Sequence, residues 1–311
     1  MTSSTPKRED LCQKVTDQVI AALEAGTRPW AQSWAGSVRL PRRQNGARYQ
    51  GVNILTLWMT SAAKGYTSPY WMTFKQAIAL GACVRKGEKG TQVVYADRIV
   101  RTETDTAGQD QERVVPFLKA YTVFNAEQIG GVPDHYLSQP VNPAPFEPMQ
   151  AAEAYFAAVP ADVEHKGAQP CYLPGRDVIS MPRREIFSSP AAYYGTRAHE
   201  TVHWTGSAAR LNRNLSTRFG DAAYAMEELV AEMGAAFVSA AVGIDTAETI
   251  REDHAPYLAG WLKKLREDKR AIFTAATKAT EALVFLDGFQ PQSTAQADEA
   301  GIGGIEAERA A

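Results

Sequence analysis

The spacing of apolar residues predicts three helices in the first part of the chain. In residues 10–26, apolar side chains recur every three or four positions, and Gly26 is suited to end the helix. Residues 53–64 and 74–80 show similar spacing, and a glycine follows each segment. The N-terminal part is therefore expected to contain helices separated by glycine-bearing turns.

Runs of β-branched and aromatic residues then predict two strands. One strand is expected at residues 91–95 and its partner at residues 118–124. The polar segment 101–113 between them predicts a connecting loop. Helices and a small sheet are thus expected to share this part of the chain.

The second half is predicted to be mainly helical. Helical spacing resumes at residues 149–158, a short strand is expected at residues 177–181, and helices dominate residues 190–286. Residues 131–148 are rich in proline, as is typical of a linker. The polar tail, residues 290–311, is expected to be disordered.

These patterns predict an α+β protein of two domains. A mixed α/β domain is expected at residues 1–130, and a mainly helical domain with a small edge sheet at residues 149–289. The length of 311 residues agrees with this division, because domains commonly contain about 100–200 residues.

The composition is that of an ordinary globular protein, with 45% hydrophobic and 22% charged residues. No segment approaches the run of about 18 apolar residues that a membrane span requires, so no membrane partner is expected. The polar start of the sequence lacks the apolar core of a secretory signal, which predicts a cytoplasmic location. The cysteines are three in number and far apart, and they predict neither a disulfide framework nor a paired-cysteine zinc site.

The formal net charge of −2 hides an asymmetry along the chain. Residues 28–98 contain eleven basic and two acidic residues, a sum of +9, whereas the rest of the chain sums to −11. A basic block of this kind favours a polyanionic partner.

Aromatic residues are interleaved with the basic ones in this block. Bases of a single strand stack on such rings while cations follow the phosphates, so single-stranded DNA is the predicted partner. The alternative for each ring is burial in the core, where large aromatic side chains concentrate. The candidate DNA-binding residues are Trp30, Trp34, Arg42, Arg43, Arg48, Tyr49, Lys64, Tyr66, Trp71, Lys75, Arg85, Lys86 and Lys89.

The strongest chemical signal is the pentapeptide HETVH at residues 199–203. Positions four apart share one face of a helix, so His199 and His203 can reach one metal ion, with Glu200 beside it. The alternative is a pair of solvated histidines near a carboxylate. The chain has only five histidines, which disfavours a chance pairing.

A catalytic zinc site needs a third protein ligand and an open position for water. The acidic segment at residues 227–232 is the best source. Glu228 and Glu232 lie one helical turn apart, which suits a ligand and a second carboxylate that orients an imidazole from behind. Glu227 and Glu232 are the alternatives to Glu228 as ligand, and these acids could also be ordinary surface charges.

One divalent metal is therefore expected, zinc first and manganese second. Such a metal lowers the pKa of its bound water toward about 7, and Glu200 is placed to act as the general base. A peptide substrate could lie along an edge strand, for which residues 177–181 are the candidate. The candidates for stabilising an oxyanion are Tyr193, Tyr194, His254 and Tyr257.

Several longer segments resemble a known family. RYQGVNILTLW (48–58), GYTSPYWMTFKQA (65–77) and VRKGEKGTQVVY (84–95) resemble the N-terminal domain of ArdC-type antirestriction proteins. YYGTRAHETVHWTG (193–206) and YAMEELVAEMGAAF (224–237) resemble the zincin-like metallopeptidase domain that follows it. The shorter motifs that agree are Trp30 with Trp34, YTVFN (121–125) and RLNR (210–213).

This resemblance implies a protein of conjugative plasmids and related mobile elements. Its N-terminal domain is expected to bind single-stranded DNA, and the protein to protect incoming DNA from host restriction. The resemblance also implies a gluzincin-type site, with His199, His203 and Glu228 on the metal and Glu200 as base.

Three functions are compatible with these observations. The first, which we predict, is an antirestriction protein with a competent metallopeptidase site. The second is a protein that shields single-stranded DNA and whose metal site does not catalyse. The third is a regulatory metallopeptidase whose basic domain docks an acidic protein.

Overall fold

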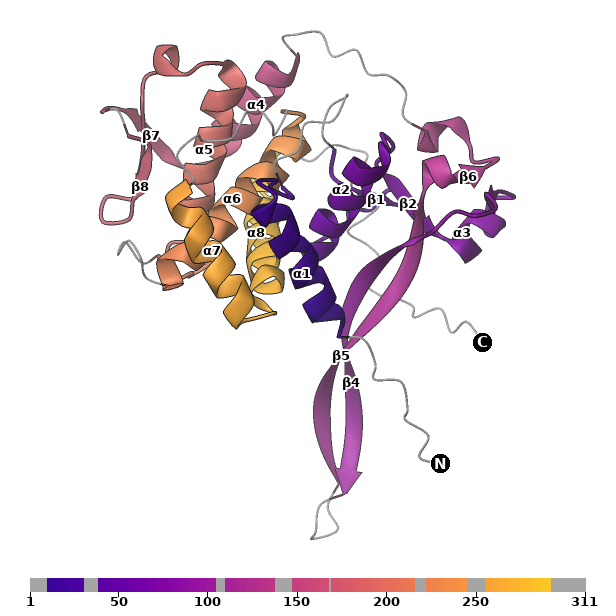
Figure 1. Cartoon of the computed structure of the whole chain (residues 1–311). Helices are drawn as coiled ribbons and strands as arrows, with labels where there is room; N and C mark the ends of the chain where they lie inside the picture. Colours follow the sequence, from indigo (N-terminus) through magenta and orange to yellow (C-terminus); the bar gives the residue numbers. More distant parts are fainter. Residues whose placement is uncertain are drawn as a thin grey trace.

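The computed structural model has two lobes, a mixed N-terminal lobe and a helical C-terminal lobe (Figure 1). It describes residues 10–30, 39–104, 110–137, 147–167, 169–215, 222–244 and 255–291. Among these residues, none of the helices has the length and apolar character needed to cross a membrane. The combination of helices and strands confirms the predicted α+β class.

Three helices form in the N-terminal lobe close to where the sequence predicts them. They are α1 (Leu11–Glu24), α2 (Val52–Lys64) and α3 (Phe74–Ala79). The Asp10 side chain accepts hydrogen bonds from two backbone N–H groups at the start of α1. Gly65 ends α2 with a φ of 72°, a left-handed conformation that glycine adopts without strain.

A four-stranded sheet lies beside these helices. Its strand order is β1 (Arg42–Arg43), β2 (Tyr70–Thr73), β5 (Asp110–Asn125) and β4 (Thr91–Thr104), and only the β1–β2 pair is parallel. The Asn53 side chain joins α2 to β4 through two hydrogen bonds of 2.8 Å with the backbone of Val94. A separate pair, β3 (Cys83–Val84) and β6 (Ile129–Gly130), lies near α3.

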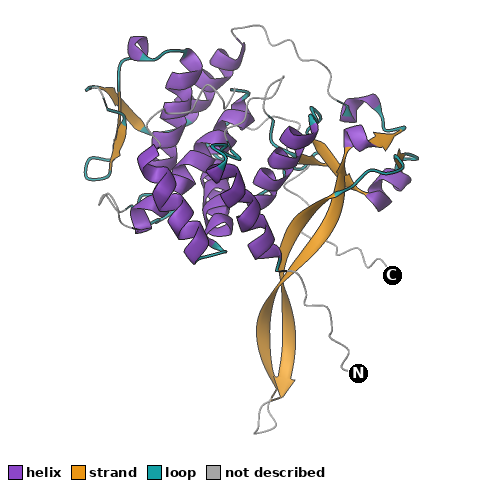
Figure 2. Cartoon of the chain, in the orientation of Figure 1, coloured by secondary structure: helices purple, strands orange, loops and turns teal. Residues whose placement is uncertain are grey.

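The loop predicted at residues 101–113 is wrong, because most of it belongs to the two paired strands. β4 continues to Thr104 and β5 begins at Asp110, and the antiparallel register holds from Thr91↔Val123 to Thr104↔Asp110. The pair projects from the body as an arm (Figure 2). Strand prediction relies on alternating apolar residues, and the polar segment 101–113 lacks that pattern, so the sequence did not predict these strands.

Five helices are present among the described residues of the C-terminal lobe. α5, α6 and α8 pack against one another, and α7 lies against α6 and α1. The bounds are α4 (Glu147–Ala158), α5 (Pro190–Thr205), α6 (Ala222–Val242), α7 (Ala255–Glu267) and α8 (Ala271–Asp287). Short 3₁₀ turns occur in both lobes, at Ala126–Gln128, Asp134–Tyr136 and Arg184–Ile186.

A three-stranded sheet borders the helical lobe. Its order is β7 (Asp162–His165), β9 (Val178–Met181) and β8 (Cys171–Leu173). The strand predicted at residues 177–181 is present as β9, but the prediction that it forms an edge is wrong. β7 pairs with one side of β9 in parallel and β8 with the other in antiparallel. The edge strands of this sheet are therefore β7 and β8, and β8 contacts α5.

One hydrophobic core runs through both lobes. The Trp58 ring on α2 meets the Phe237 ring on α6 edge-on, with centroids 5.7 Å apart, and Trp30 meets Trp261 on α7 at 5.8 Å. Arg48 adds an ion pair of 2.7 Å to Asp287 at the end of α8. The domain boundaries at residues 131–148 stay a prediction.

This shared core predicts cooperative unfolding. Trp58→Ala should lower the free energy of unfolding by about 3–5 kcal/mol, because it leaves a cavity between the lobes. A single transition is expected in urea, with tryptophan fluorescence and far-UV circular dichroism changing together. Ile186→Ala, at a side chain that is exposed, is the control and should change stability little. Two separate transitions in the wild type would contradict a shared core.

Candidate metal centre

Helix α5 places the HETVH segment against the core. The Ser189 hydroxyl accepts a hydrogen bond of 3.1 Å from the Ala192 N–H, and Pro190 occupies the first helical position. His199 and Glu200 are 2% and 3% exposed. Polar side chains this deeply buried need partners, and the neighbouring helix α6 provides those of His199.

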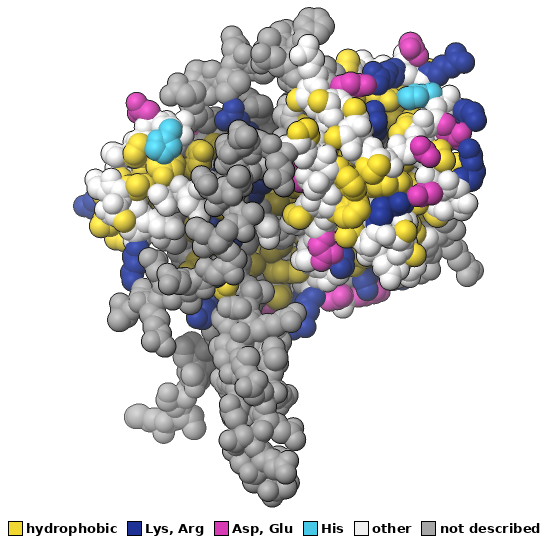
Figure 3. All heavy atoms as spheres, turned by 180° about the vertical axis from the view of Figure 1, so that it is seen from behind, with side chains coloured by type: hydrophobic (Ala, Val, Ile, Leu, Met, Phe, Trp, Pro, Cys, Tyr) yellow, Lys and Arg dark blue, Asp and Glu magenta, His cyan; other side chains and the backbone are white. Residues whose placement is uncertain are grey.

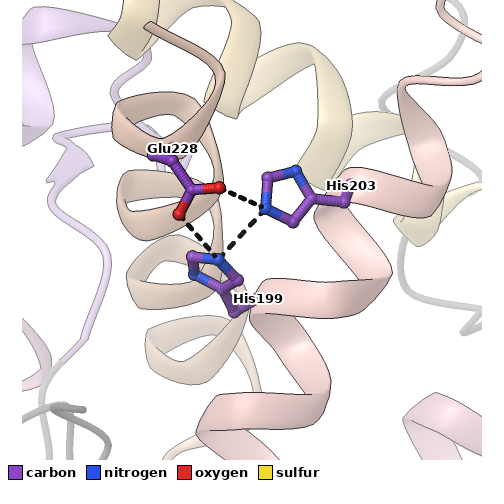
Figure 4. A group of neighbouring side chains, drawn as sticks. All are labelled: His199, His203 and Glu228. Carbon is purple, nitrogen blue, oxygen red and sulfur yellow. Dashed lines mark hydrogen bonds and ion pairs between the residues drawn. The ribbon is translucent and has the colours of Figure 1, made fainter. Parts of the chain in front are cut away.

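The partner is Glu228 on α6, which points at both histidines (Figure 4). His199 Nε2 lies 3.7 Å from Glu228 Oε2, and His203 Nε2 lies 3.5 Å from Glu228 Oε1. The two Nε2 atoms are 3.1 Å apart. Three potential ligand atoms thus face one point from two helices.

These separations fit a metal ion. Ligand atoms at the corners of a tetrahedron, each about 2.0–2.1 Å from zinc, lie about 3.3 Å from one another. The observed distances of 3.1, 3.5 and 3.7 Å bracket that value. Two imidazoles and one carboxylate also leave the fourth position free for water, as a catalytic site requires.

A second carboxylate lies behind each histidine. Glu232 Oε1 is 3.1 Å from His199 Nδ1, a hydrogen-bond distance although the alignment is not ideal. Glu227 Oε1 is 3.2 Å from His203 Nδ1. Glu232 thus stands where an orienting carboxylate was predicted. The matching position of Glu227 was not predicted, because the sequence alone did not show which way its side chain points.

The surrounding charges favour protonated histidines in the absence of metal. Burial disfavours the charged imidazole, but Glu228 and Glu232 outweigh it and raise the pKa of His199 to about 10. Glu227 and Glu228 likewise outweigh burial and raise the pKa of His203 to about 9. Burial opposes the charged Glu228 carboxylate, and the two histidines nevertheless hold its pKa well below the ordinary value.

Glu200 is close enough to His199 and to Cys171 on β8 for its charge to influence both groups. Its charge contributes to the raised pKa of His199. Burial raises the pKa of Cys171, and the charge of Glu200 raises it further.

Two of the candidate oxyanion-stabilising residues are engaged elsewhere. The Tyr193 hydroxyl lies 2.9 Å from His165 Nε2, and the Tyr194 hydroxyl donates to Glu153. Both contacts face α4 and β7 rather than the ligands. His254 and the side chain of Tyr257 lie outside the described residues.

The candidate DNA-binding residues differ in how far their side chains are exposed to solvent. Trp30, Tyr49 and Trp71 are between 1% and 7% exposed, so these rings are in the core and offer no face to a base. Trp34 lies outside the described residues. Arg42, Arg48 and Tyr66 are half-buried. The exposed candidates are Arg43, Lys64, Lys75, Arg85, Lys86 and Lys89. Phe74 and Tyr121 are also exposed. Phe74 lies within the basic block, but neither ring is among the candidates, because the sequence does not show which rings are exposed.

Two family models match the chain, one on each lobe. Residues 9–124 match the N-terminal domain of anti-restriction factor ArdC. Residues 150–278 match a zincin-like metallopeptidase.

Similar proteins include two from bacteria. An uncharacterized protein, y4eC of Sinorhizobium fredii, is 39% identical over 307 residues, which cover 96% of this chain and 98% of that protein. A DNA primase, TraC of Escherichia coli, is 36% identical over 313 residues, and the match covers 92% of this chain. The chain spans only 28% of that primase.

Solved structures of the antirestriction protein ArdC from plasmid R388 have the same fold. The metal-free structure is 42% identical and superposes with a TM-score of 0.77, covering 90% of this chain and 98% of that one. The Mn(II)-bound structure is 41% identical, with a TM-score of 0.73 and the same coverage. This likeness and the zincin-like domain support one divalent metal in the protein.

The raised pKa values predict that protons compete with the metal. Affinity for Zn²⁺ should rise as the pH increases from about 6.5 toward 9, because bound metal requires neutral imidazoles. Calorimetry in buffers of different ionisation enthalpy should show proton release on binding. His199→Ala should abolish both the binding and the proton release. Affinity that does not change over this pH range would contradict the protonated metal-free state.

Proposed function

The chain belongs to the family of ArdC-type antirestriction proteins, and on that premise we propose how its two lobes act. The N-terminal lobe binds single-stranded DNA, and the C-terminal lobe holds one divalent metal in a metallopeptidase-type site. The protein thereby protects DNA that enters the cell on a mobile element from host restriction. The observation that carries the enzymatic part is the joint burial of Glu200 with three convergent ligand atoms.

The charge of the N-terminal lobe supports a DNA partner. Residues 28–98 sum to +9, and cations spread over a surface attract a phosphate backbone. In Figure 3 basic side chains outnumber acidic ones on the visible N-terminal lobe, whereas both signs mix over the helical lobe. The lobe named in the family match is thus also the more basic one.

We place the DNA contact at one corner of this lobe, formed by α3 and the turn before β4. Thr73 at the start of α3 and Thr91 at the start of β4 both pair with Val123, one from each side. Strands in a sheet lie about 4.8 Å apart, so Thr73 and Thr91 are about 10 Å from each other, and Phe74 and Lys89 lie one and two residues away from them along the chain. Phe74 is 54% exposed. An exposed ring can stack on a base, and cations on either side of the ring can contact the neighbouring phosphates.

Zinc is the metal that the ligands suit best. Two imidazoles and a carboxylate form the His₂Glu set of many catalytic zinc sites. Manganese is the second candidate, because the R388 protein has a Mn(II)-bound structure.

A peptide is the proposed substrate of this site. An extended chain can pair with the open edge of β8, which lies against α5. A bound metal supplies an acidified water and polarises the scissile carbonyl. Glu200 accepts the proton from the nucleophile and returns it to the leaving amine. The buried position of Glu200 keeps bulk water away from that transfer.

The DNA proposal predicts a charge-dependent loss of affinity. The triple variant Lys75→Ala, Lys86→Ala, Lys89→Ala should bind a fluorescent oligothymidine more weakly. The slope of log affinity against log salt should fall by about 2, since each phosphate contact on a single strand contributes about 0.7. Phe74→Ala should weaken binding with little change in that slope.

The matched control removes three cations from the helical lobe. Lys166→Ala, Lys263→Ala, Lys278→Ala changes the net charge equally and should retain both affinity and slope. Equal losses in the two triple variants would show a general charge effect and contradict the proposed corner. A preference for duplex over single-stranded DNA would contradict the partner itself.

The catalytic proposal predicts that one substitution separates chemistry from binding. Glu200→Ala should keep metal content and oligonucleotide affinity, because it removes neither a ligand nor a surface cation. It should abolish peptide hydrolysis, measured on a library of quenched fluorescent peptides. If the variant still protects plasmid DNA on entry into a restricting strain, shielding by DNA binding alone is the mechanism.

A further inference from the structure

The carboxylate behind His203 is itself held in place. Glu227 is 6% exposed and directly precedes the ligand Glu228 on α6. Its Oε1 atom lies 3.2 Å from His203 Nδ1, on the side of the ring opposite the ligand atom Nε2. The direction of the His203 ring therefore depends on where Glu227 is fixed.

The Arg213 guanidinium donates hydrogen bonds to the Glu227 carboxylate from two of its nitrogen atoms. Arg213 Nε donates to Glu227 Oε2 at 3.0 Å, and Arg213 Nη2 donates to Oε1 at 2.9 Å. This two-pronged geometry fixes the carboxylate plane, which a lysine ammonium cannot do. The Arg213 side chain is only 5% exposed, so the interaction is shielded from water.

The same guanidinium is anchored to α5. Arg213 Nη2 donates to the carbonyl oxygen of Val202 at 2.6 Å, and Nη1 donates to the Thr205 hydroxyl at 2.9 Å. Val202 adjoins His203 in the chain. Arg213 thus connects the helix that carries the histidines to the helix that carries Glu228.

We propose that Arg213 is a positioning residue of the metal centre, acting through Glu227 on His203. The proposal rests on the metal-binding function proposed above. With Glu227 held from outside, the His203 ring keeps Nε2 directed at the metal position even when no metal is bound. An ordinary buried ion pair would stabilise the fold alone, whereas this pair also orients a ligand.

Arg210, three residues earlier in the same loop, offers a contrast. Its guanidinium lies 3.9 Å from the centre of the Trp204 ring, donates to the Asp177 carboxylate at 3.0 Å and donates to the Tyr172 hydroxyl at 3.1 Å. These contacts hold the β8–β9 turn against α5 and include neither His203 nor Glu227. Arg210 is therefore the matched control.

The test measures zinc affinity by competition with a chromophoric chelator. Arg213→Lys and Arg213→Met should weaken affinity about 10–100-fold, the usual effect of losing a group that orients a ligand. Arg213→Met removes a positive charge near the zinc ion, which by itself should strengthen zinc binding. A weaker zinc affinity in this variant therefore cannot result from the change in charge. Arg210→Met should bind zinc like the wild type. Thermal unfolding with excess chelator shows whether each variant is folded. If Arg213→Met does not fold, the test rests on Arg213→Lys.

A double-mutant cycle tests whether Arg213 acts on His203 through Glu227. If Arg213 acts through Glu227, Glu227→Gln and the double variant with Arg213→Lys should lose similar affinity, well short of the product of the two single losses. The visible spectrum of the Co²⁺-loaded Arg213→Lys protein should also differ from the wild type, while that of Arg210→Met should not.

Several outcomes would overturn the proposal. Wild-type or tighter zinc binding by Arg213→Lys would do so, as would fully multiplicative losses in the cycle or equal losses in Arg210→Met. A wild-type protein that binds no zinc would instead refute the metal centre proposed above, and this inference with it.

Discussion

The metal centre depends on the close approach of helices α5 and α6. A Cβ atom at Gly234 would lie 2.8 and 2.9 Å from the two Cγ atoms of Val202, closer than real Cβ contacts come. Glycine therefore lets the helices meet at Val202, which adjoins His203 in the chain. Glu228, earlier on the same helix as Gly234, then reaches the ligand atoms of both histidines. The separation that a metal requires is thus set by backbone packing.

Burying so many ionisable groups is tolerable only because they neutralise one another. His199 and His203 face Glu228 on one side and a second carboxylate on the other. One of these carboxylates is held by Arg213 from the same lobe. The other influences the N-terminal lobe: burial lowers the pKa of Arg28, and the charge of Glu232 counteracts that fall. The charge of Glu232 therefore acts on a residue of the N-terminal lobe as well as on His199.

The sequence predicted what depends on local periodicity and missed what depends on tertiary placement. The four-residue spacing of His199 and His203 places them on one helical face wherever the helix lies. The orienting role of Glu227 was missed because it requires Arg213, which a loop brings back to α6. The strand order that makes β9 central depends on β7, which was not recognised. Likewise, composition shows that rings and cations occur together but not which rings are buried, and Trp30 and Trp71 belong to the core.

The distribution of these rings shows how the two lobes are joined. Trp30 and Trp58 pack against Trp261 and Phe237 of the helical lobe. Separating the lobes would expose four large aromatic side chains that are each at most 5% accessible in the whole chain. The N-terminal lobe therefore uses part of its aromatic residues to complete the core that it shares with the helical lobe. Because one core spans both lobes, neither lobe can bury its apolar side chains fully without the other, and the two lobes form a single folding unit.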